Sequence, residues 1–199
     1  LTLKISESVL SALADLKPAR VSTGNFGIGM YTRNRLIKKL GNKNNDFSYI
    51  ALEQVGRRKA IIRSYSAHAT TLGEKNLEIS ADYPGYWQRK METSYDYAIF
   101  FSGSVGSQSP VGEGEGFDKP KYIGEALADS LSKHLTNSVF SDTTSFTSLT
   151  LKMHLPEYHV RLTTKLNLAT SLSKTLLPLS GNVYLQAVRI GNMIWITTP

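Results

Sequence analysis

A histidine and a serine are the two residues of this chain best suited to chemistry. His68 follows the apolar segment 59–67, which reads as a strand, and the small and hydroxyl residues Ala69-Thr70-Thr71 come directly after it. The end of a strand is a rigid platform facing a cleft, and an imidazole placed there suits a metal ligand or a catalytic base. A histidine with a purely structural role fits the same pattern.

Ser109 is the candidate nucleophile. It stands in the loop Gly106-Ser-Gln-Ser-Pro110, where glycine permits a tight backbone and proline determines the exit. A serine hydroxyl is a weak nucleophile at neutral pH and needs a base or a metal-bound hydroxide to take its proton. The sequence has no Gly-x-Ser-x-Gly elbow, and the nearest similar segment, Ser102-Gly-Ser-Val-Gly106, makes Ser104 the second candidate. A polar loop without catalysis is the alternative interpretation.

Three segments then follow one another in an informative order: His68-Ala-Thr-Thr, Ile79-Ser-Ala-Asp-Tyr-Pro-Gly-Tyr86 and Gly106-Ser-Gln-Ser-Pro110. They resemble the neutral/alkaline non-lysosomal ceramidase family, serine- and zinc-dependent amidases that cleave the N-acyl bond of sphingolipids. The family pattern is a zinc histidine followed by small and hydroxyl residues, an Ile-Ser-Ser-Asp-x-x-Gly-Tyr segment, and a Gly-x-x-Ser-Pro loop that holds the nucleophile. Weaker similarities are the pair Asn34-Arg35 and segment 189–199, which resembles the strand before the family's Pro-Gly-Glu loop.

The resemblance implies roles for three residues. Ser109 would attack the amide carbonyl, His68 would be one ligand of a zinc ion, and Arg35 would point its guanidinium toward the polar head of the substrate. Zinc lowers the pKa of its bound water to about 7, so the ion would supply the base that a serine needs. For Arg35 the alternative is a solvent-exposed helix arginine, and a helix N-cap explains Asp82 without catalysis.

The resemblance also implies that residues 1–199 are part of a ceramidase-like catalytic domain and lack its N-terminal and C-terminal portions. One zinc histidine would lie upstream, and an acidic ligand and a tyrosine would lie downstream. The chain begins without methionine and stops at Pro199 inside an apparent strand, so we expect a processed or truncated piece. We expect this piece alone to bind zinc poorly, because tight sites need three or four ligands.

The chain departs from the family pattern at three points. Ser109 follows His68 by fewer residues than is typical of the family, Val111 replaces an asparagine, and Gln108 precedes the serine. These differences bear on the specificity for sphingolipids, through the substrate cleft and the head-group contact, more than on the amidase class.

The sequence therefore favours a hydrolase that cleaves the N-acyl amide bond of ceramide-like sphingolipids with a zinc-assisted serine nucleophile. Two alternatives remain: a non-catalytic ceramidase-like module that binds lipid or glycan at the cell surface, and a zinc hydrolase of other acyl amides or esters. The resemblance implies a lipid substrate and an extracellular, periplasmic or cell-envelope location.

The elements that would position these residues follow from periodicity and turn signals. The pattern predicts an α/β or α+β domain with a mixed sheet and flanking helices. Predicted helices are 3–16, 82–95 and 120–135; predicted strands are 21–30, 47–55, 59–66, a buried strand at 97–101, 145–155, 158–168, 183–190 and 193–198.

Composition limits the remaining classes. A chain of 199 residues, 41% hydrophobic, is long enough for one well-cored domain, and the absence of cysteine excludes disulfides and thiolate metal sites. The formal charge of +7 comes from dispersed basic residues, so no nucleic-acid partner is expected. Attraction to anionic membrane surfaces fits this charge equally well. The longest apolar runs are far below the ~20 residues that cross a bilayer.

Overall fold

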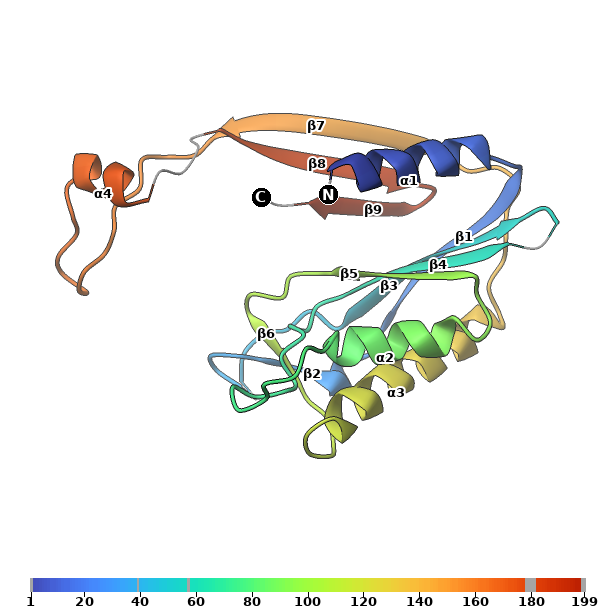
Figure 1. The fold of residues 1–199 in the computed structure, drawn as a ribbon, viewed down its shortest axis with the longest axis horizontal. Helices are drawn as coiled ribbons and strands as arrows, with labels where there is room; N and C mark the ends of the chain where they lie inside the picture. The colour runs from blue at the N-terminus through green and yellow to red at the C-terminus, as the bar shows by residue number, and fades with distance from the viewer. Residues whose placement is uncertain (1, 39, 57, 178–181, 198–199) are drawn as a thin grey trace. The chain divides into compact units, whose positions relative to one another are not determined.

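The chain folds into two compact units, Leu1–Thr144 and Ser145–Pro199 (Figure 1). The structure is a computed structural model, and it describes residues 2–38, 40–56, 58–177 and 182–197. None of the helices in these ranges has the length and apolar character that a membrane span requires.

Unit 1 is built on a four-stranded mixed sheet with the order β1-β3-β4-β5. Strands β1 (Ala19–Gly27), β3 (Asp46–Gln54) and β4 (Lys59–Tyr65) pair antiparallel, and β5 (Tyr97–Ser102) pairs parallel to β4. Parallel neighbours need a crossover connection, which here contains helix α2 (Asp82–Met91). The predicted α/β fold with a mixed sheet and flanking helices is confirmed.

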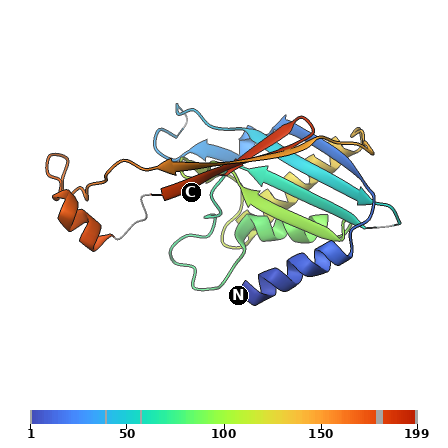
Figure 2. The same cartoon turned by 90° about the horizontal axis from the view of Figure 1, so that it is seen from above.

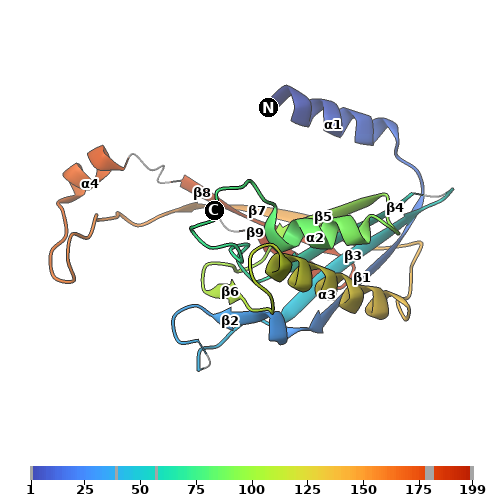
Figure 3. The same ribbon diagram turned by 60° about the horizontal axis from the view of Figure 1, so that its bottom comes forward.

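Helices α2 and α3 (Asp118–Leu135) cover one face of this sheet (Figure 3, green and olive). The apolar residues of α3 recur every four positions, as the sequence pattern predicts, so they form one stripe that turns toward the sheet. The core between helices and sheet includes Phe47, Ile61, Trp87, Ile123, Leu127 and Leu131, all with 0% exposure.

The opposite face of the sheet is more open. The prediction of a buried strand at 97–101 is wrong in this respect, because Tyr97, Ile99 and Phe101 are 51%, 44% and 50% exposed. Side chains alternate between the two faces of a strand, and only Ala98 and Phe100 of this stretch belong to the core cluster under the helices. Helix α1 (Thr2–Ala14) forms as predicted, but none of its residues is buried.

A short second ribbon of unit 1 carries part of the candidate site. It pairs β2 (Thr32–Asn34), which follows the 3-10 turn η1 (Gly29–Tyr31), with β6 (Gln108–Pro110) in antiparallel register. The two strands lie about 75 residues apart in the chain, yet Arg33 stands opposite Ser109.

Unit 2 contains an antiparallel sheet of β7 (Phe146–His154), β8 (Asn182–Ile190) and β9 (Met193–Thr197) (Figure 2, orange to red). Gly191, with φ of 60°, forms the predicted tight turn between β8 and β9. The predicted strand at 158–168 is wrong: that segment holds only an isolated bridge, Arg161 with Asn167, before helix α4 (Thr170–Leu176). The last two positions of the segment 189–199 lie outside the described residues.

Gly124 allows α2 and α3 to approach closely. A Cβ at this position would lie 2.5 Å from the Tyr83 carbonyl oxygen and 2.8 Å from the Trp87 nitrogen. Both contacts are with the backbone of α2, so the side chain could not be accommodated unless the helices moved apart.

We therefore expect Gly124→Ala to lower the free energy of unfolding by about 1–3 kcal/mol, the usual cost of overpacking. Alanine is otherwise the better helix former by ~1 kcal/mol, so a loss of stability isolates the packing effect. Urea unfolding measures it, with Gly27→Ala as the control because a Cβ there meets nothing within 4 Å. Equal midpoints for Gly124→Ala and the parent would contradict the close approach.

Candidate active site

Backbone hydrogen bonds bring the three predicted site segments together around β6. On one side of β6, Arg33 of β2 is the register partner of Ser109, and the Arg35 N–H donates to the Ser107 carbonyl at 2.9 Å. On its other side, the His68 N–H donates to the Gln108 carbonyl at 3.2 Å. The sequence could place these residues only on separate strand ends and loops.

Ser109 is half-buried, while its neighbours Gln108 and Pro110 are buried. The alternation of side chains along β6 places Ser109 on the more accessible face of the ribbon. There Arg33 Nε donates to Ser109 Oγ at 3.3 Å. Sequence reasoning missed Arg33, because its contact with Ser109 depends on the pairing of β2 with β6, which no local pattern shows.

Arg35 holds the loop that leads into β6. Its Nη1 donates to the Gly106 carbonyl at 3.4 Å, and the side chain is exposed. Arg35 lies in a turn after β2, where Asn34 Oδ1 accepts from the Leu36 and Ile37 N–H groups at 2.9 and 3.0 Å. The alternative of a solvent-exposed helix arginine is confirmed for the exposure and wrong for the helix, and contact with a substrate head group stays a prediction.

His68 carries a buried polar atom without a partner. Its Nδ1 makes no hydrogen bond with the described residues, while its backbone carbonyl accepts from Thr70 N at 2.8 Å. A buried nitrogen without a partner is uncommon and costs about 1–3 kcal/mol, so it marks a position where a ligand could bind.

The segment just before His68 is held from several sides. Tyr83 Oη donates to the Ala67 carbonyl, and Thr32 Oγ1 donates to the Ser66 carbonyl at 3.1 Å. Ser66 Oγ accepts from the Ser104 N–H at 3.1 Å and lies 3.2 Å from Ser104 Oγ. Ser104, the second candidate nucleophile, is thus engaged in supporting this segment.

Asp82 connects the loop after His68 to the start of α2. The prediction that it is the N-cap is wrong, because Ala81 occupies that position and Asp82 itself has φ of 54°. Aspartate tolerates this left-handed conformation better than most residues. Its Oδ2 accepts from Thr71 N at 2.9 Å and from Thr71 Oγ1 at 2.7 Å.

Arg63 is a second unusual residue near the site that sequence reasoning missed. It lies within the apolar strand β4, where the sequence does not show that an arginine is buried. It is fully buried, and its guanidinium carbon lies 3.5 Å from the Phe100 ring centroid and 4.7 Å from that of Trp87. Its three side-chain nitrogens find no hydrogen-bond partner among the described residues. Burial lowers the pKa of Arg63 to about 9. The aromatic rings partly compensate the cost by cation–π attraction.

The described residues do not assemble a metal site by themselves. No group of three or more histidine, cysteine, aspartate or glutamate side chains in these ranges is placed to hold an ion. His68 can offer one imidazole donor, whereas structural and catalytic zinc sites use three or four protein ligands. The donor set of the described residues therefore does not fit a complete zinc site.

Comparison with known proteins identifies the fold. No protein-family model matches the chain, and no curated protein matches it in sequence. The chain is similar to the crystal structure of neutral ceramidase from Pseudomonas aeruginosa, with a TM-score of 0.67 and 18% identity, over 96% of this chain and 41% of that one. It is also similar to the structure titled ceramidase complexed with C2, with a TM-score of 0.69 and 17% identity, over 93% of this chain and 42% of that one.

The chain thus has the fold of part of these ceramidase structures and spans less than half of their length. The predicted resemblance is confirmed at the level of the fold. The roles of Ser109, His68 and Arg35 as nucleophile, zinc ligand and head-group contact stay predictions.

The tyrosines around the site predict how stability depends on pH. Burial raises the pKa of Tyr83 to about 12, and burial also raises the pKa of Tyr65. Unfolded tyrosine loses its proton near pH 10, so the folded chain holds more protons than the unfolded chain between about pH 10 and 12. The stabilisation is complete below pH 10 and is lost as the pH rises through this window.

We expect each such tyrosine to lower the free energy of unfolding above pH 10 by up to about 1.4 kcal/mol per pH unit. Arg63 acts in the opposite direction, because its lowered pKa means that the folded chain binds fewer protons there than the unfolded chain, and it offsets about one such tyrosine. Urea titrations at pH 9, 10 and 11 measure the slope, and Tyr83→Phe should make it shallower by about one proton. Identical slopes for the parent and Tyr83→Phe would show that Tyr83 does not carry the effect.

Proposed function

We propose that this chain is part of a hydrolase that cleaves the N-acyl amide bond of ceramide-like lipids, with Ser109 as the nucleophile. The observation that carries the proposal is the convergence on β6 of Ser109, the Arg33 guanidinium and the His68 segment. The fold likeness to structures named as ceramidases supports the same reaction class.

The proposed reaction proceeds in two steps. Ser109 Oγ attacks the amide carbonyl carbon and forms an ester bond, the C–N bond breaks, and the proton from the serine ends on the leaving amine. Water then hydrolyses the acyl-enzyme, which releases a fatty acid and restores the hydroxyl. Arg33 Nε, which donates to Ser109 Oγ at 3.3 Å, favours the alkoxide form of the serine as the proton leaves.

Arg35 and His68 receive supporting roles in this proposal. The exposed guanidinium of Arg35, anchored at the Gly106 carbonyl, is placed to contact the polar head of the lipid. His68 would donate one imidazole to a zinc ion whose other ligands lie outside the described residues. Bound zinc would act as a Lewis acid and lower the pKa of its water. Since the described donor set is incomplete, we assign no step to the metal.

The cellular setting is part of the same proposal. An extracellular, periplasmic or cell-envelope location would give the enzyme access to its lipid substrate. The net charge of +7 would favour contact with anionic membrane surfaces.

Replacement of the nucleophile tests the reaction. In a longer version of the protein that hydrolyses an N-acylsphingosine, Ser109→Ala should lower kcat by roughly a thousandfold or more, because a covalent step is lost. Ser107→Ala, an exposed serine of the same loop, is the matched control and should retain activity. If Ser109→Ala retains turnover and Ser104→Ala loses it, the nucleophile is Ser104 and not Ser109. Lipid binding without turnover in the parent would favour the non-catalytic module.

Metal removal tests the role of His68 separately. We expect a chelator to abolish activity of the longer protein and added zinc to restore it, and His68→Ala should lower the zinc content measured by elemental analysis. Residues 1–199 alone should bind zinc more weakly than micromolar, because they offer an incomplete donor set. Micromolar or tighter binding by this piece would show that the metal site is wrongly assigned.

A further inference from the structure

A cavity of about 610 Å³ lies between helix α1 and the open face of the unit 1 sheet. The sheet side includes Leu52, Ala60 and Tyr97, which are cross-strand neighbours on β3, β4 and β5. The helix side includes Ser8, Ser11 and Ala12. A cavity of this volume is within the range of roughly 300–1,000 Å³ in which proteins bind small molecules.

The cavity exists because α1 turns its smallest side chains toward the sheet. Residues 8, 11 and 12 lie on one helix face by their spacing of three and four. Their short side chains cannot fill the space above Leu52 and Tyr97, while Leu10 and Leu13 are 65% and 56% exposed to solvent. The space is an open groove, because the α1 residues that line it are exposed, and its volume is large enough for a small molecule to lie between the helix and the sheet.

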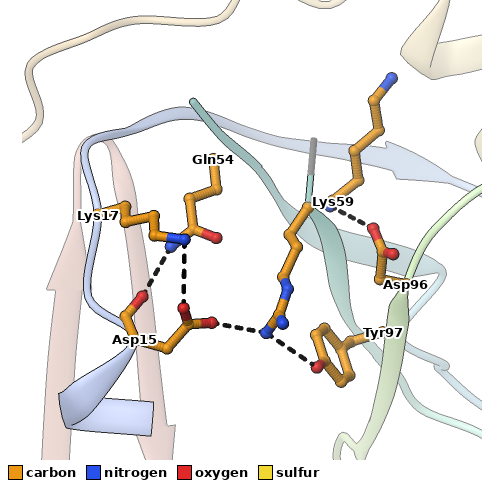
Figure 4. Close-up of polar contacts among 7 residues, drawn as sticks. Asp15, Lys17, Gln54, Lys59, Asp96 and Tyr97 are labelled. Atoms are coloured by element: carbon orange, nitrogen blue, oxygen red, sulfur yellow. Dashed lines mark hydrogen bonds and ion pairs between the residues drawn. The ribbon is translucent and has the colours of Figure 1, made fainter. Parts of the chain in front are cut away.

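The mouth of the cavity has an excess of positive charge. Its described lining residues include three cations, Lys17, Arg58 and Lys59, and one carboxylate, that of Asp15. Asp15 Oδ2 pairs with Arg58 Nη1 at 2.6 Å, and Lys17 Nζ lies 3.4 Å from Asp15 Oδ1 (Figure 4).

Two carboxylates that contact Lys59, those of Glu53 and Asp96, lie outside the lining. Glu53 pairs with Arg20 at 2.7 Å and with Lys59 at 3.3 Å. Asp96 accepts the Lys59 backbone N–H at 2.7 Å (Figure 4). With Lys59 paired to Glu53, the two cations Arg58 and Lys17 share the single carboxylate of Asp15, which leaves an excess of one positive charge at the mouth.

The same polar contacts attach the end of α1 to the strands. Gln54 Nε2 donates to the Asp15 carbonyl at 2.9 Å, and Arg58 Nη1 lies 3.5 Å from Tyr97 Oη (Figure 4). The mouth is therefore lined by charged and hydrogen-bonded groups, whereas the floor at Leu52, Ala60 and Tyr97 is mainly apolar.

We propose that this cavity binds a single-chain amphiphile, with its hydrocarbon chain over Leu52 and Ala60 and an anionic carboxylate head at Arg58 and Lys17. The chemistry is that of a fatty acid anion: an apolar floor buries the chain, and a guanidinium recognises a carboxylate well. This binding site is separate from Ser109. Lys59 begins β4 and His68 follows its end, so the seven-residue strand, roughly 20 Å long, lies between the two regions. The inference does not rest on the proposed hydrolase function.

Calorimetric titration of the full chain with monomeric decanoate tests the chain-binding part. Ala12→Phe, which places a ring in the cavity from an exposed helix position, should weaken decanoate binding at least tenfold. Ala14→Phe is the matched control on the same helix outside the lining, and should bind within twofold of the parent. Equal affinity of the parent and Ala12→Phe, or no binding by the parent, would overturn the proposal.

Recognition of the carboxylate head group is tested by comparing decanoate with 1-decanol, which has no charge. Lys17→Gln should weaken decanoate binding three- to tenfold and leave 1-decanol binding unchanged, whereas Lys133→Gln on α3 should change neither. Equal losses for decanoate and decanol would overturn the assignment of the head group. Vesicles of phosphatidylglycerol distinguish the source of the chemistry: binding to vesicles without binding of monomeric decanoate would mean that a membrane surface, not the cavity, is the partner.

Discussion

The one-sided coverage of the unit 1 sheet is the constraint on which the rest of this structure depends. Side chains alternate along β3, β4 and β5, so every second residue faces α2 and α3 and its neighbours face away. Phe47, Ile61 and Ala98 therefore enter the core, while Tyr97, Ile99 and Phe101 remain accessible. The same alternation sends Arg63 into the core among aromatic rings and leaves Leu52 and Ala60 on the face that forms the floor of the cavity under α1.

The candidate active site depends on a different property, the two edges of a single short strand. β6 is paired along one edge with β2 and is contacted at its other edge by the His68 N–H. Backbone groups make these contacts, so they are insensitive to side-chain identity and explain how Ser109, His68 and Arg33 converge from distant parts of the sequence. Tyr83 and Asp82 then stabilise the flanking segment through the Ala67 carbonyl and Thr71.

Burial of the Arg63 guanidinium in the core beside this site costs free energy of folding. A buried guanidinium without hydrogen-bond partners among the described residues loses its hydration, and cation–π contact with Phe100 and Trp87 recovers only part of that loss. The Arg63 guanidinium packs against a layer of aromatic rings that includes Tyr83. The Tyr83 hydroxyl in turn donates to the Ala67 carbonyl, in the segment before His68. Core packing and site geometry are thus coupled through one layer of side chains.

The sequence by itself determined the elements with a strong local signal. The apolar stripe of α3, the β3–β4 hairpin and the turn at Gly191 follow from periodicity and turn chemistry, which act within a few residues. The ordered motifs around His68, Asp82 and Ser109 also pointed correctly to a ceramidase-like fold. The prediction for segment 158–168 failed because the alternating pattern pairs with no strand among the described residues and forms only the internal bridge of Arg161 with Asn167.

Only the tertiary structure decided which residues meet. Arg33 rather than Arg35 contacts Ser109, because strand register across some 75 intervening residues cannot be read from local patterns. The left-handed Asp82, the buried Arg63 and the cavity beneath α1 likewise depend on which face of an element finds a partner. Local chemistry specifies each helix and strand, whereas long-range pairing and one-sided burial specify the sites between them.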